Sequence, residues 1–442
     1  MKSISIFGFT GSIGSQALDI IEKHQEAFEI DVFVCKENID KAINLINVHK
    51  PKNVFIFNPK ARLKIIEGCS NKTNFFQSYD DMREYISLNK SDIYLSAISS
   101  FECLDLTLDA AKSGGKLLLA NKESLVVFGN QIISECKSNN TELIPIDSEH
   151  FSLFTALKNI ERNNISRVFL TASGGPFRGL SIDEIFNKSV EEALDHPNWD
   201  MGSKITIDSA TLVNKCFELI EAKHLFSLNP DLLNIVVQKQ SIIHSLVELK
   251  DGSVEAQMSK PSMIIPLAFG LLGEHSEKIK KIYLLDLFDQ DFELSIEAFP
   301  KDRKELLEIT NDVMKNDDNS GLIFATLNDI AVKKYLQKKI KFGEIYNIGC
   351  DEGMEFSVLE VAQILINKIQ LTTNYDKGIS YIKNRPFNDQ RYYISNHKLK
   401  SLGWDVKIPF EKGINDLITF YESCKQMKEI TQLSRNPSEQ QI

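Results

Sequence analysis

Three acidic residues in two short strings could together hold a metal ion. Asp147 and Glu149 lie two residues apart, directly after the apolar run 143–146, and Glu218 lies in a stretch with the apolar spacing of a helix. If the run is extended, its alternating side chains would turn Asp147 and Glu149 to the same side. Three carboxylates without a cysteine suit Mg²⁺ or Mn²⁺ better than zinc. The trio predicts a site for a hard divalent cation, whereas each acid alone would be read as a solvated surface group.

A second set of side chains could bind a phosphate group. Ser173 and the two glycines after it follow the predicted strand 168–172, where a hydroxyl and backbone amides can surround an anion. Ser209, Asn214 and Lys215 add a hydroxyl, an amide and one cation. Because these groups follow the acidic string in the chain, we expect a phosphorylated substrate that also chelates the metal.

The polar segment 181–204 separates the two phosphate-binding strings and contains Trp199. One large aromatic side chain in a long polar stretch is typical of a lid that closes over substrate and excludes water. The alternative is that Trp199 only anchors a surface loop. Further on, residues 236–247 are predicted to form one strand, and His244 within it is expected to be a core histidine.

A glycine-rich turn near the N-terminus indicates a dinucleotide site. Glycines 8, 11 and 14 lie between an apolar strand and a helical stretch, where they allow a tight turn and let backbone N–H groups approach a pyrophosphate. The alternative is a turn that only packs the helix on the sheet. Lys36 and Glu37 stand at the end of the second strand. An acidic residue there favours NAD and a basic residue favours NADP, so this pair does not decide between the two cofactors.

Alternating strands and helices over residues 1–145 must position these groups. Strands are predicted at 4–7, 30–34, 53–57, 93–97 and 116–119, and helices at 18–23, 41–49, 104–112 and 132–137. This order predicts an α/β fold with a doubly wound parallel sheet, which binds ligands at the carboxyl ends of its strands. The polar residues 121–124 follow one of those strands and are expected at the same edge.

Composition limits the other classes of function. The chain has 442 residues, enough for two to four domains, and its 43% hydrophobic and 25% charged residues are ordinary for a globular protein. A net charge of −10 argues against nucleic acid or an anionic membrane as partner. Seven scattered cysteines without a C-x-x-C pair are typical of reduced thiols. With no signal-peptide pattern and no long apolar run, we expect a cytoplasmic protein.

At these motifs the chain strongly resembles the 1-deoxy-D-xylulose 5-phosphate reductoisomerases. The strings that carry the resemblance span residues 10–14, 121–125, 147–150, 173–177, 196–202, 204–211, 214–222 and 240–245. The resemblance implies conversion of 1-deoxy-D-xylulose 5-phosphate to 2-C-methyl-D-erythritol 4-phosphate, with NADPH and Mg²⁺ or Mn²⁺, in isoprenoid precursor biosynthesis. It also implies a homodimer. A catalytically degenerate protein that binds a nucleotide or a nucleotide sugar is the alternative.

The resemblance assigns roles residue by residue. Asp147, Glu149 and Glu218 would hold the metal; Ser173, Ser209, Asn214 and Lys215 would bind the phosphate; and Lys122, Ser148 and His196 would complete the substrate site. The cofactor would contact Thr10, Gly11, Ser12, Ile13, Lys36, Glu37, Asn38, Asn121, Glu123 and Gly202. Departures from the family pattern include Phe9 in the glycine turn, Lys36 and Glu37 near the ribose site, residues 99–103, and Gln238-Lys239 before Gln240.

The family fold implies a division of the chain into domains. Residues 1–150 would form the Rossmann-like NADP-binding domain, 151–285 an α+β catalytic domain with a lid at about 181–204, and 286–342 a linker and the start of a mostly helical C-terminal region. Residues 343–425 resemble the end of nucleotide-sugar 4,6-dehydratases, with Arg385-Pro386 and Leu402-Gly-Trp404 as the most specific strings. We expect 343–442 to be an atypical tail that serves as a structural cap; the alternative is a retained nucleotide-sugar site around Arg385 and Arg391.

Overall fold

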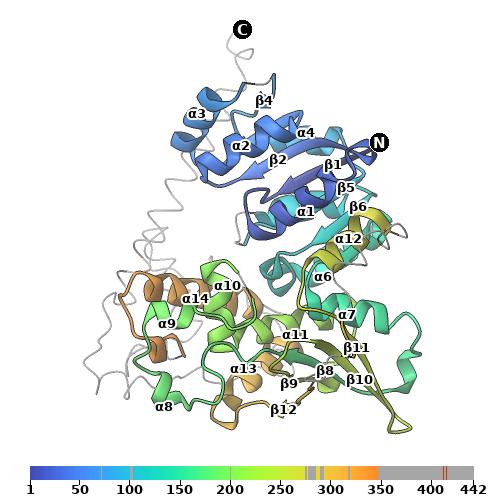
Figure 1. Ribbon diagram of the computed structural model, residues 1–442, viewed down its shortest axis with the longest axis vertical. Helices are drawn as coiled ribbons and strands as arrows, with labels where there is room; N and C mark the ends of the chain where they lie inside the picture. The colour runs from blue at the N-terminus through green and yellow to red at the C-terminus, as the bar shows by residue number, and fades with distance from the viewer. Residues whose placement is uncertain are drawn as a thin grey trace, which may run out of the picture. The chain divides into compact units, whose positions relative to one another are not determined.

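The computed structural model describes residues 1–346, apart from 71, 100–102, 200, 274–275, 277–284, 289–292 and 317–318, together with residues 412 and 415. Residues Met1–Phe342 form one compact unit and Gly343–Ile442 a second. The account below concerns the first unit (Figure 1). The tail predicted to begin at 343 lies almost entirely outside the described residues.

Strands and helices alternate through the first 145 residues as predicted, but α3, β4, α4 and β7 were not among the predicted elements. The strands are β1 (Lys2–Phe7), β2 (Phe28–Cys35), β3 (Asn53–Ile56), β4 (Asn74–Phe75), β5 (Ile93–Ser96), β6 (Lys116–Leu119), β7 (Glu142–Pro145), β8 (Ile165–Ala172), β9 (Leu233–Val237), β10 (Ile243–Leu249), β11 (Val254–Met258) and β12 (Glu297–Ala298). The α-helices are α1 (Ser12–Glu22), α2 (Ile39–His49), α3 (Pro59–Gly68), α4 (Tyr79–Leu88), α5 (Leu104–Ala111), α6 (Lys122–Ser138), α7 (Ser148–Ala156), α8 (Ile182–Ile185), α9 (Val190–Leu194), α10 (Ser203–Thr211), α11 (Val213–Phe226), α12 (Ile264–Leu272), α13 (Lys304–Lys315) and α14 (Ser320–Leu336). The 3₁₀ helices are η1 (Gln25–Ala27), η3 (Arg162–Asn164), η4 (Pro230–Leu232), η6 (Lys301–Arg303) and η7 (Phe342–Tyr346).

The first sheet is parallel throughout and has the order β4-β3-β2-β1-β5-β6-β7. The chain builds outward from β1 to β4 and then returns to β5 beside β1, so the strand order reverses between these two strands. This reversal opens a crevice at their carboxyl ends, the usual ligand position in such sheets. The predicted α/β fold with a doubly wound parallel sheet is confirmed.

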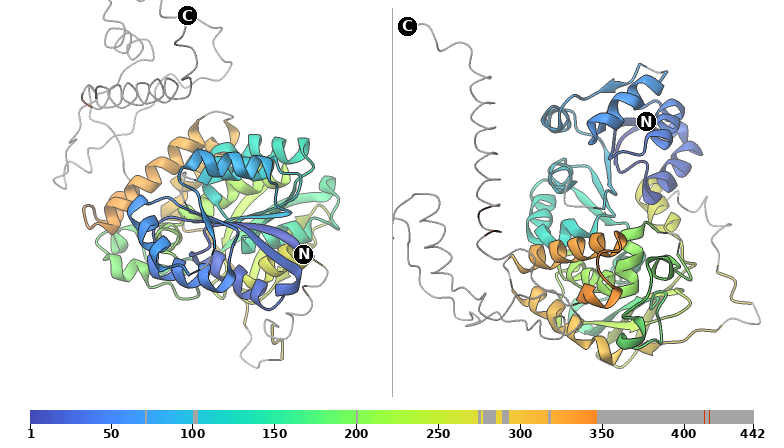
Figure 2. Two further views of the ribbon diagram at one scale, coloured as in Figure 1. Left: turned by 90° about the horizontal axis from the view of Figure 1, so that it is seen from above. Right: turned by 90° about the vertical axis from the view of Figure 1, so that its left-hand side faces the viewer.

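Helices cover both faces of this sheet (Figure 2). One apolar core joins the sheet to α1, α2, α3 and α12, and the other joins it to α4, α5 and α6. Helix α12 comes from much later in the chain and packs against α1. Because α12 lies between β11 and β12 of the second sheet in the chain, it ties the two halves of the unit together.

The second sheet has the order β11-β10-β8-β9-β12, and its strands are antiparallel except for the pair β8 and β9. Helices α7 and α11 pack on it. The single strand predicted at 236–247 is wrong, because residues 238–242 form a tight turn between β9 and β10. Ser241 adopts a left-handed backbone conformation there, with φ of 53°. Apolar residues on both sides of the turn conceal it in the sequence.

Phe9 occupies the tightest part of the glycine turn and is fully buried. Its ring stacks on Phe33 with a centroid separation of 4.3 Å and an interplanar angle of 10°. The large side chain that departs from the family pattern is therefore packed in the core between α1 and the sheet.

We expect Phe9→Ala to lower the free energy of unfolding by about 3–5 kcal/mol, because it removes a buried ring and leaves a cavity. Urea denaturation measures this change. Leu63→Ala is the control, since Leu63 lies in the same domain but is 64% exposed. An equal effect of the two substitutions would contradict the assigned packing of Phe9.

Candidate active site

A cavity of about 550 Å³ lies where the carboxyl ends of the first sheet meet the helices of the second half. The sequence-predicted residues that line it are Gly11, Ser12, Ile13, Lys122, Asp147, Ser148, Glu149, Ser173, His196, Gly202, Ser209, Asn214, Lys215 and Glu218. They come from segments more than 200 residues apart in the chain. The fold therefore gathers the acidic string, the phosphate-binding strings and the glycine turn around one space.

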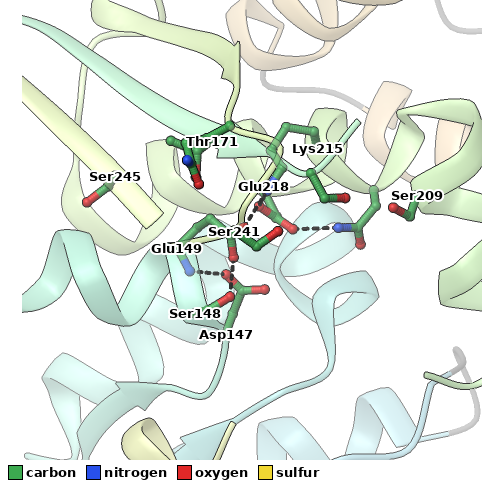
Figure 3. A network of polar contacts seen from close by, with 12 residues as sticks. Asp147, Ser148, Glu149, Thr171, Ser209, Lys215, Glu218, Ser241 and Ser245 are labelled. Atoms are coloured by element: carbon green, nitrogen blue, oxygen red, sulfur yellow. Dashed lines mark hydrogen bonds and ion pairs between the residues drawn. The ribbon is translucent and has the colours of Figure 1, made fainter. Parts of the chain in front are cut away.

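The three acidic residues converge as predicted, but for a different reason. Strand β7 ends at Pro145, and Asp147 is the N-cap of α7, where its carboxylate accepts from the backbone N–H groups of Glu149 and His150 at 3.1 Å. Glu149 then lies in the first turn of that helix, so helix geometry and not strand alternation turns it toward Asp147. Glu218 reaches them from α11 (Figure 3).

The carboxylates of Asp147, Glu149 and Glu218 each offer an oxygen within 4.8 Å of the other two. An all-oxygen donor set of this spacing fits Mg²⁺ or Mn²⁺. Burial and the charge of Asp147 raise the pKa of Glu218, while Lys122 and His150 overcome the burial of Asp147 and hold its pKa well below the ordinary value. The cluster thus concentrates negative charge that a divalent cation would neutralise.

Two lysines balance part of this charge. Lys122 pairs with Asp147 and, at 2.8 Å, with Glu218; Lys215 pairs with Glu218 and, at 2.9 Å, with Glu149. Burial by itself would lower the pKa of both ammonium groups, but the surrounding carboxylates raise it. Asn214, predicted for the phosphate, donates from Nδ2 to Glu218 Oε1 at 2.6 Å. Lys215 and Asn214, both predicted to bind the phosphate, thus contact the carboxylates in this structure.

His196 organises the opposite side of the cavity. Its Nδ1 accepts from the backbone N–H groups of Asn198 and Trp199 at 3.2 and 3.1 Å, so the ring is neutral and carries its proton on Nε2. Nε2 lies 3.1 Å from Ser173 Oγ and 3.2 Å from Ser209 Oγ. Burial lowers the pKa of His196, in agreement with a neutral ring. One imidazole N–H and two hydroxyls thus meet at one point.

Buried polar side chains next to the carboxylates hold them in place. His150 is fully buried; its Nε2 donates to the backbone oxygen of Glu218 at 2.8 Å, and its Nδ1 lies 3.0 Å from Asp147 Oδ1. Although burial opposes a charge, Glu221 and Asp147 raise the pKa of His150 to about 9. Burial raises the pKa of Glu221 to about 7. Through these two contacts His150 joins α7 to α11.

The glycine turn has the form of a cradle for the cofactor. Gly8 has φ of 98°, and a Cβ added there would lie 2.6 Å from the backbone oxygen of Ala97. A Cβ at Gly14 would lie 2.3 Å from the Gly8 oxygen. Gly11 caps α1, and the start of this helix lines the cavity, where its unpaired N–H groups favour a phosphate.

Six residues predicted to contact the cofactor do not line the cavity: Thr10, Lys36, Glu37, Asn38, Asn121 and Glu123. Asn38 and Asn121 are the N-caps of α2 and α6. Glu37 accepts from Asn58 Nδ2 at 3.1 Å, and Glu123 pairs with Lys204 at 2.9 Å. Their cofactor roles stay predictions. Of the divergent segment 99–103, residues 100–102 lie outside the described part of the chain.

Several cavity residues had no assigned role in the sequence. Asn198, Met201, Lys204, Ser262 and Met263 all line the space. Asn198 and Met201 lie within the quoted string 196–202, so their neighbours were a usable signal. Met263 precedes α12, whose return to the first half no local pattern indicates. His244, expected in the core, is indeed buried, with 3% of its surface exposed.

Comparisons with known proteins agree with this architecture. Residues 4–129 match the family model of 1-deoxy-D-xylulose 5-phosphate reductoisomerase, and residues 143–226 and 258–372 match models of C-terminal domains of the same enzyme. The reductoisomerase of Clostridium acetobutylicum is 38% identical over 383 residues, which cover 86% of this chain and 99% of that protein. The Pelagibacter ubique enzyme is 38% identical and covers 78% and 89%.

Solved structures of the same enzyme superpose on most of the described chain. A crystal structure of DOX-P reductoisomerase in complex with NADPH, fosmidomycin and magnesium has a TM-score of 0.72 and 34% identity, covering 78% of this chain and 87% of that one. The Zymomonas mobilis enzyme in complex with NADPH has a TM-score of 0.70 and 32% identity, covering 78% of this chain and 89% of that one.

Among the described residues, no helix is both long and apolar enough to cross a membrane.

The predicted change of family after Phe342 is not supported. The match to the C-terminal domain of the reductoisomerase continues beyond that point to residue 372, and the comparisons do not support a resemblance of the tail to nucleotide-sugar dehydratases. Arg385 and Trp404, on which that interpretation depended, lie outside the described residues. Three matched models, relatives aligned over most of their length and the solved structures all agree, and the chain belongs to the 1-deoxy-D-xylulose 5-phosphate reductoisomerase family.

Proposed function

We propose that the cavity is the site at which this protein converts 1-deoxy-D-xylulose 5-phosphate to 2-C-methyl-D-erythritol 4-phosphate with NADPH and a divalent metal ion. The observation that carries the proposal is that three carboxylates and two lysines line the same cavity as His196 and the two serine hydroxyls it contacts. The glycine turn borders this cavity. A protein that only bound a nucleotide would have no need of a metal-binding trio beside a phosphate site.

Asp147, Glu149 and Glu218 would hold Mg²⁺, and Mn²⁺ suits the same oxygen donors. When bound, the ion supplies a Lewis acid that polarises the substrate's oxygens, and NADPH supplies the hydride. The protein's own residues do the rest. Ser173, Ser209 and the Nε2–H of His196 would donate hydrogen bonds to the phosphate, and Lys215, which lines the same cavity, would add a positive charge.

Lys122 extends from the first turn of α6 to the carboxylates and lines the cavity. Its ammonium group is placed to stabilise negative charge on a substrate oxygen as the carbon skeleton rearranges. Trp199 and Met201 line the same cavity, and the 181–204 segment would act as the lid that excludes water. The glycine turn and the N-terminus of α1 would bind the NADPH pyrophosphate.

Domain boundaries near 150 and 285, a homodimer and a cytoplasmic location are further proposals from the family resemblance. Sedimentation velocity of the full chain should give the mass of two copies, whereas a single-copy mass would contradict the dimer.

The function is tested by NADPH oxidation in the purified protein. Absorbance should fall only when 1-deoxy-D-xylulose 5-phosphate and Mg²⁺ are both present, and the product should be 2-C-methyl-D-erythritol 4-phosphate. NADH in place of NADPH tests whether Glu37 or Lys36 decides the cofactor. Absence of turnover with either nucleotide, from a folded protein, would favour the degenerate binding protein.

The neutral ring of His196 predicts a pH dependence. Since burial lowers its pKa, the unfolded chain binds a proton on this ring more readily than the folded protein does. The stability that the neutral ring contributes is therefore complete above about pH 6.5 and is lost as pH falls through the lower folded pKa. Urea unfolding should show the stability difference between wild type and His196→Gln shrinking from pH 8 to pH 5. A difference that grows on acidification would contradict this account.

A further inference from the structure

The side chain of Asn198 attaches the loop residues 195–199 to a turn of the second sheet. Asn198 Nδ2 donates to the backbone oxygen of Lys239 at 2.7 Å and to Ser241 Oγ at 2.9 Å. Both acceptors belong to the turn between β9 and β10, about 40 residues further along the chain. Asn198 is half-buried and lies between the two loop residues, His196 and Trp199, that face the cavity.

The acceptor turn is itself rigidly built. Gln238 is fully buried, and its side-chain oxygen accepts from the backbone N–H groups of Ile242 at 2.8 Å and Ile243 at 3.4 Å. The backbone N–H of Gln238 donates to the backbone oxygen of Ala172, the last residue of β8, at 2.8 Å. Gln238 thus crosses the turn from inside, and the turn presents the Lys239 oxygen outward at a fixed position. Gln238 and Lys239 are among the departures from the family pattern noted in the sequence.

Asn198 connects this contact to the imidazole ring of His196. The backbone N–H of Asn198 donates to Nδ1 of His196 while the Asn198 side chain holds the turn. Nε2 of His196 in turn meets Ser173 and Ser209. Movement of Asn198 away from the turn would therefore release the His196 ring from its orientation and move Trp199 with it.

We propose that Asn198 is a positioning residue that latches the loop residues 195–199 to the turn 238–241, so that His196 and Trp199 stay at the cavity. The latch acts through the two N–H bonds of the amide. Its kinetic consequence rests on the proposed function, but the latch itself is a property of the protein without substrate.

Asn198→Asp and Asn198→Ala separate the latch from simple packing. The aspartate has the same shape but no N–H, and its charge faces the Lys239 oxygen, which can only accept. If the amide works as a donor, Asp is at least as damaging as Ala; if Asn198 only fills space, Asp resembles wild type. Loss of two ordinary hydrogen bonds predicts a roughly 10- to 30-fold rise in KM for the phosphorylated substrate, with kcat changed less than about threefold, because substrate binding closes the loop again.

A spectroscopic readout tests the loop directly. The chain has two tryptophans, Trp199 and Trp404, so in a Trp404→Phe background the fluorescence reports on Trp199 alone. Acrylamide should quench Trp199 more strongly in both Asn198 variants, with no substrate present. Asn187→Ala is the matched control, since Asn187 is an exposed asparagine in the same polar segment 181–204. This substitution should leave quenching and KM unchanged.

A double variant adds an internal check. Ser241→Ala removes one of the two acceptors and should raise quenching less than Asn198→Ala does. Combined, the two substitutions should give no more than Asn198→Ala alone, because both break the same contact. Melting temperatures within a few degrees of wild type establish that each variant is folded.

The outcomes distinguish the latch from the proposed function. Increased quenching of Trp199 supports the latch even if wild type shows no NADPH oxidation, a result that would overturn only the function. Wild-type quenching in Asn198→Asp overturns the latch. A raised KM with unchanged quenching also overturns it, because Asn198 would then act on the substrate and not on the loop.

Discussion

Glu218→Gln is expected to lower kcat/KM by about 10³-fold, since the substitution removes one of three metal-binding carboxylates with almost no change in shape. Lewis-acid catalysis contributes several kcal/mol to such reactions, and each 1.36 kcal/mol is a factor of ten, so a loss of about 4 kcal/mol is the natural estimate. Steady-state NADPH oxidation over a range of Mg²⁺ concentrations measures the loss. A rise in the melting temperature with Mn²⁺, expected for wild type, should be greatly reduced in the variant.

Glu221→Gln is the matched control for this substitution. Glu221 lies one helical turn further along α11 and is also buried, but it contacts His150 and not the metal-binding trio directly. As a supporting residue it should cost no more than about tenfold to a hundredfold. Equal losses in Glu218→Gln and Glu221→Gln would contradict the assignment of the metal to the trio.

Lys215→Met should make the protein less stable without Mg²⁺ and should increase the stabilisation that Mg²⁺ provides. Without the ammonium group, the buried carboxylates of Glu149 and Glu218 lose a paired cation, and breaking a buried pair in this way costs about 3–5 kcal/mol of stability. A divalent ion at the same carboxylates would replace the missing charge. The melting temperature of Lys215→Met should therefore rise more with Mg²⁺ than that of wild type does. Activity should stay low, with a KM raised about 10²-fold, because the phosphate loses a charge-assisted donor.

Lys223→Met is the control for that experiment, since Lys223 lies on the same helix but outside the cavity. Its response to Mg²⁺ should match wild type. A Mg²⁺ shift in Lys215→Met equal to or smaller than that of wild type would show that Lys215 does not balance the metal-binding carboxylates.

The metal, phosphate and cofactor motifs could be identified in the sequence because each is local. Gly8 and Gly14 are adjacent to the strand and helix they join, and the steric reason for glycine at each is a backbone contact within or beside that turn. Asp147 and Glu149 are neighbours in the chain, and their convergence was predicted although the reason was wrong. Asp147 is the N-cap of α7 and its carboxylate turns back onto the first turn of that helix, where Glu149 lies. The parallel sheet was equally readable, because apolar strands and amphipathic helices alternate at regular spacing.

Contacts between distant segments were decided by the tertiary structure alone. Sequence spacing cannot show that Lys122 meets Glu218 across 96 residues, that His150 joins α7 to α11, or that Asn198 holds the β9–β10 turn. Each of these depends on how two sheets are packed by α12 and α11, and packing depends on the sum of many weak apolar contacts, none of which has a local signature. The sequence determined which chemical groups this protein carries; the packing of its two halves decided which of them face one another.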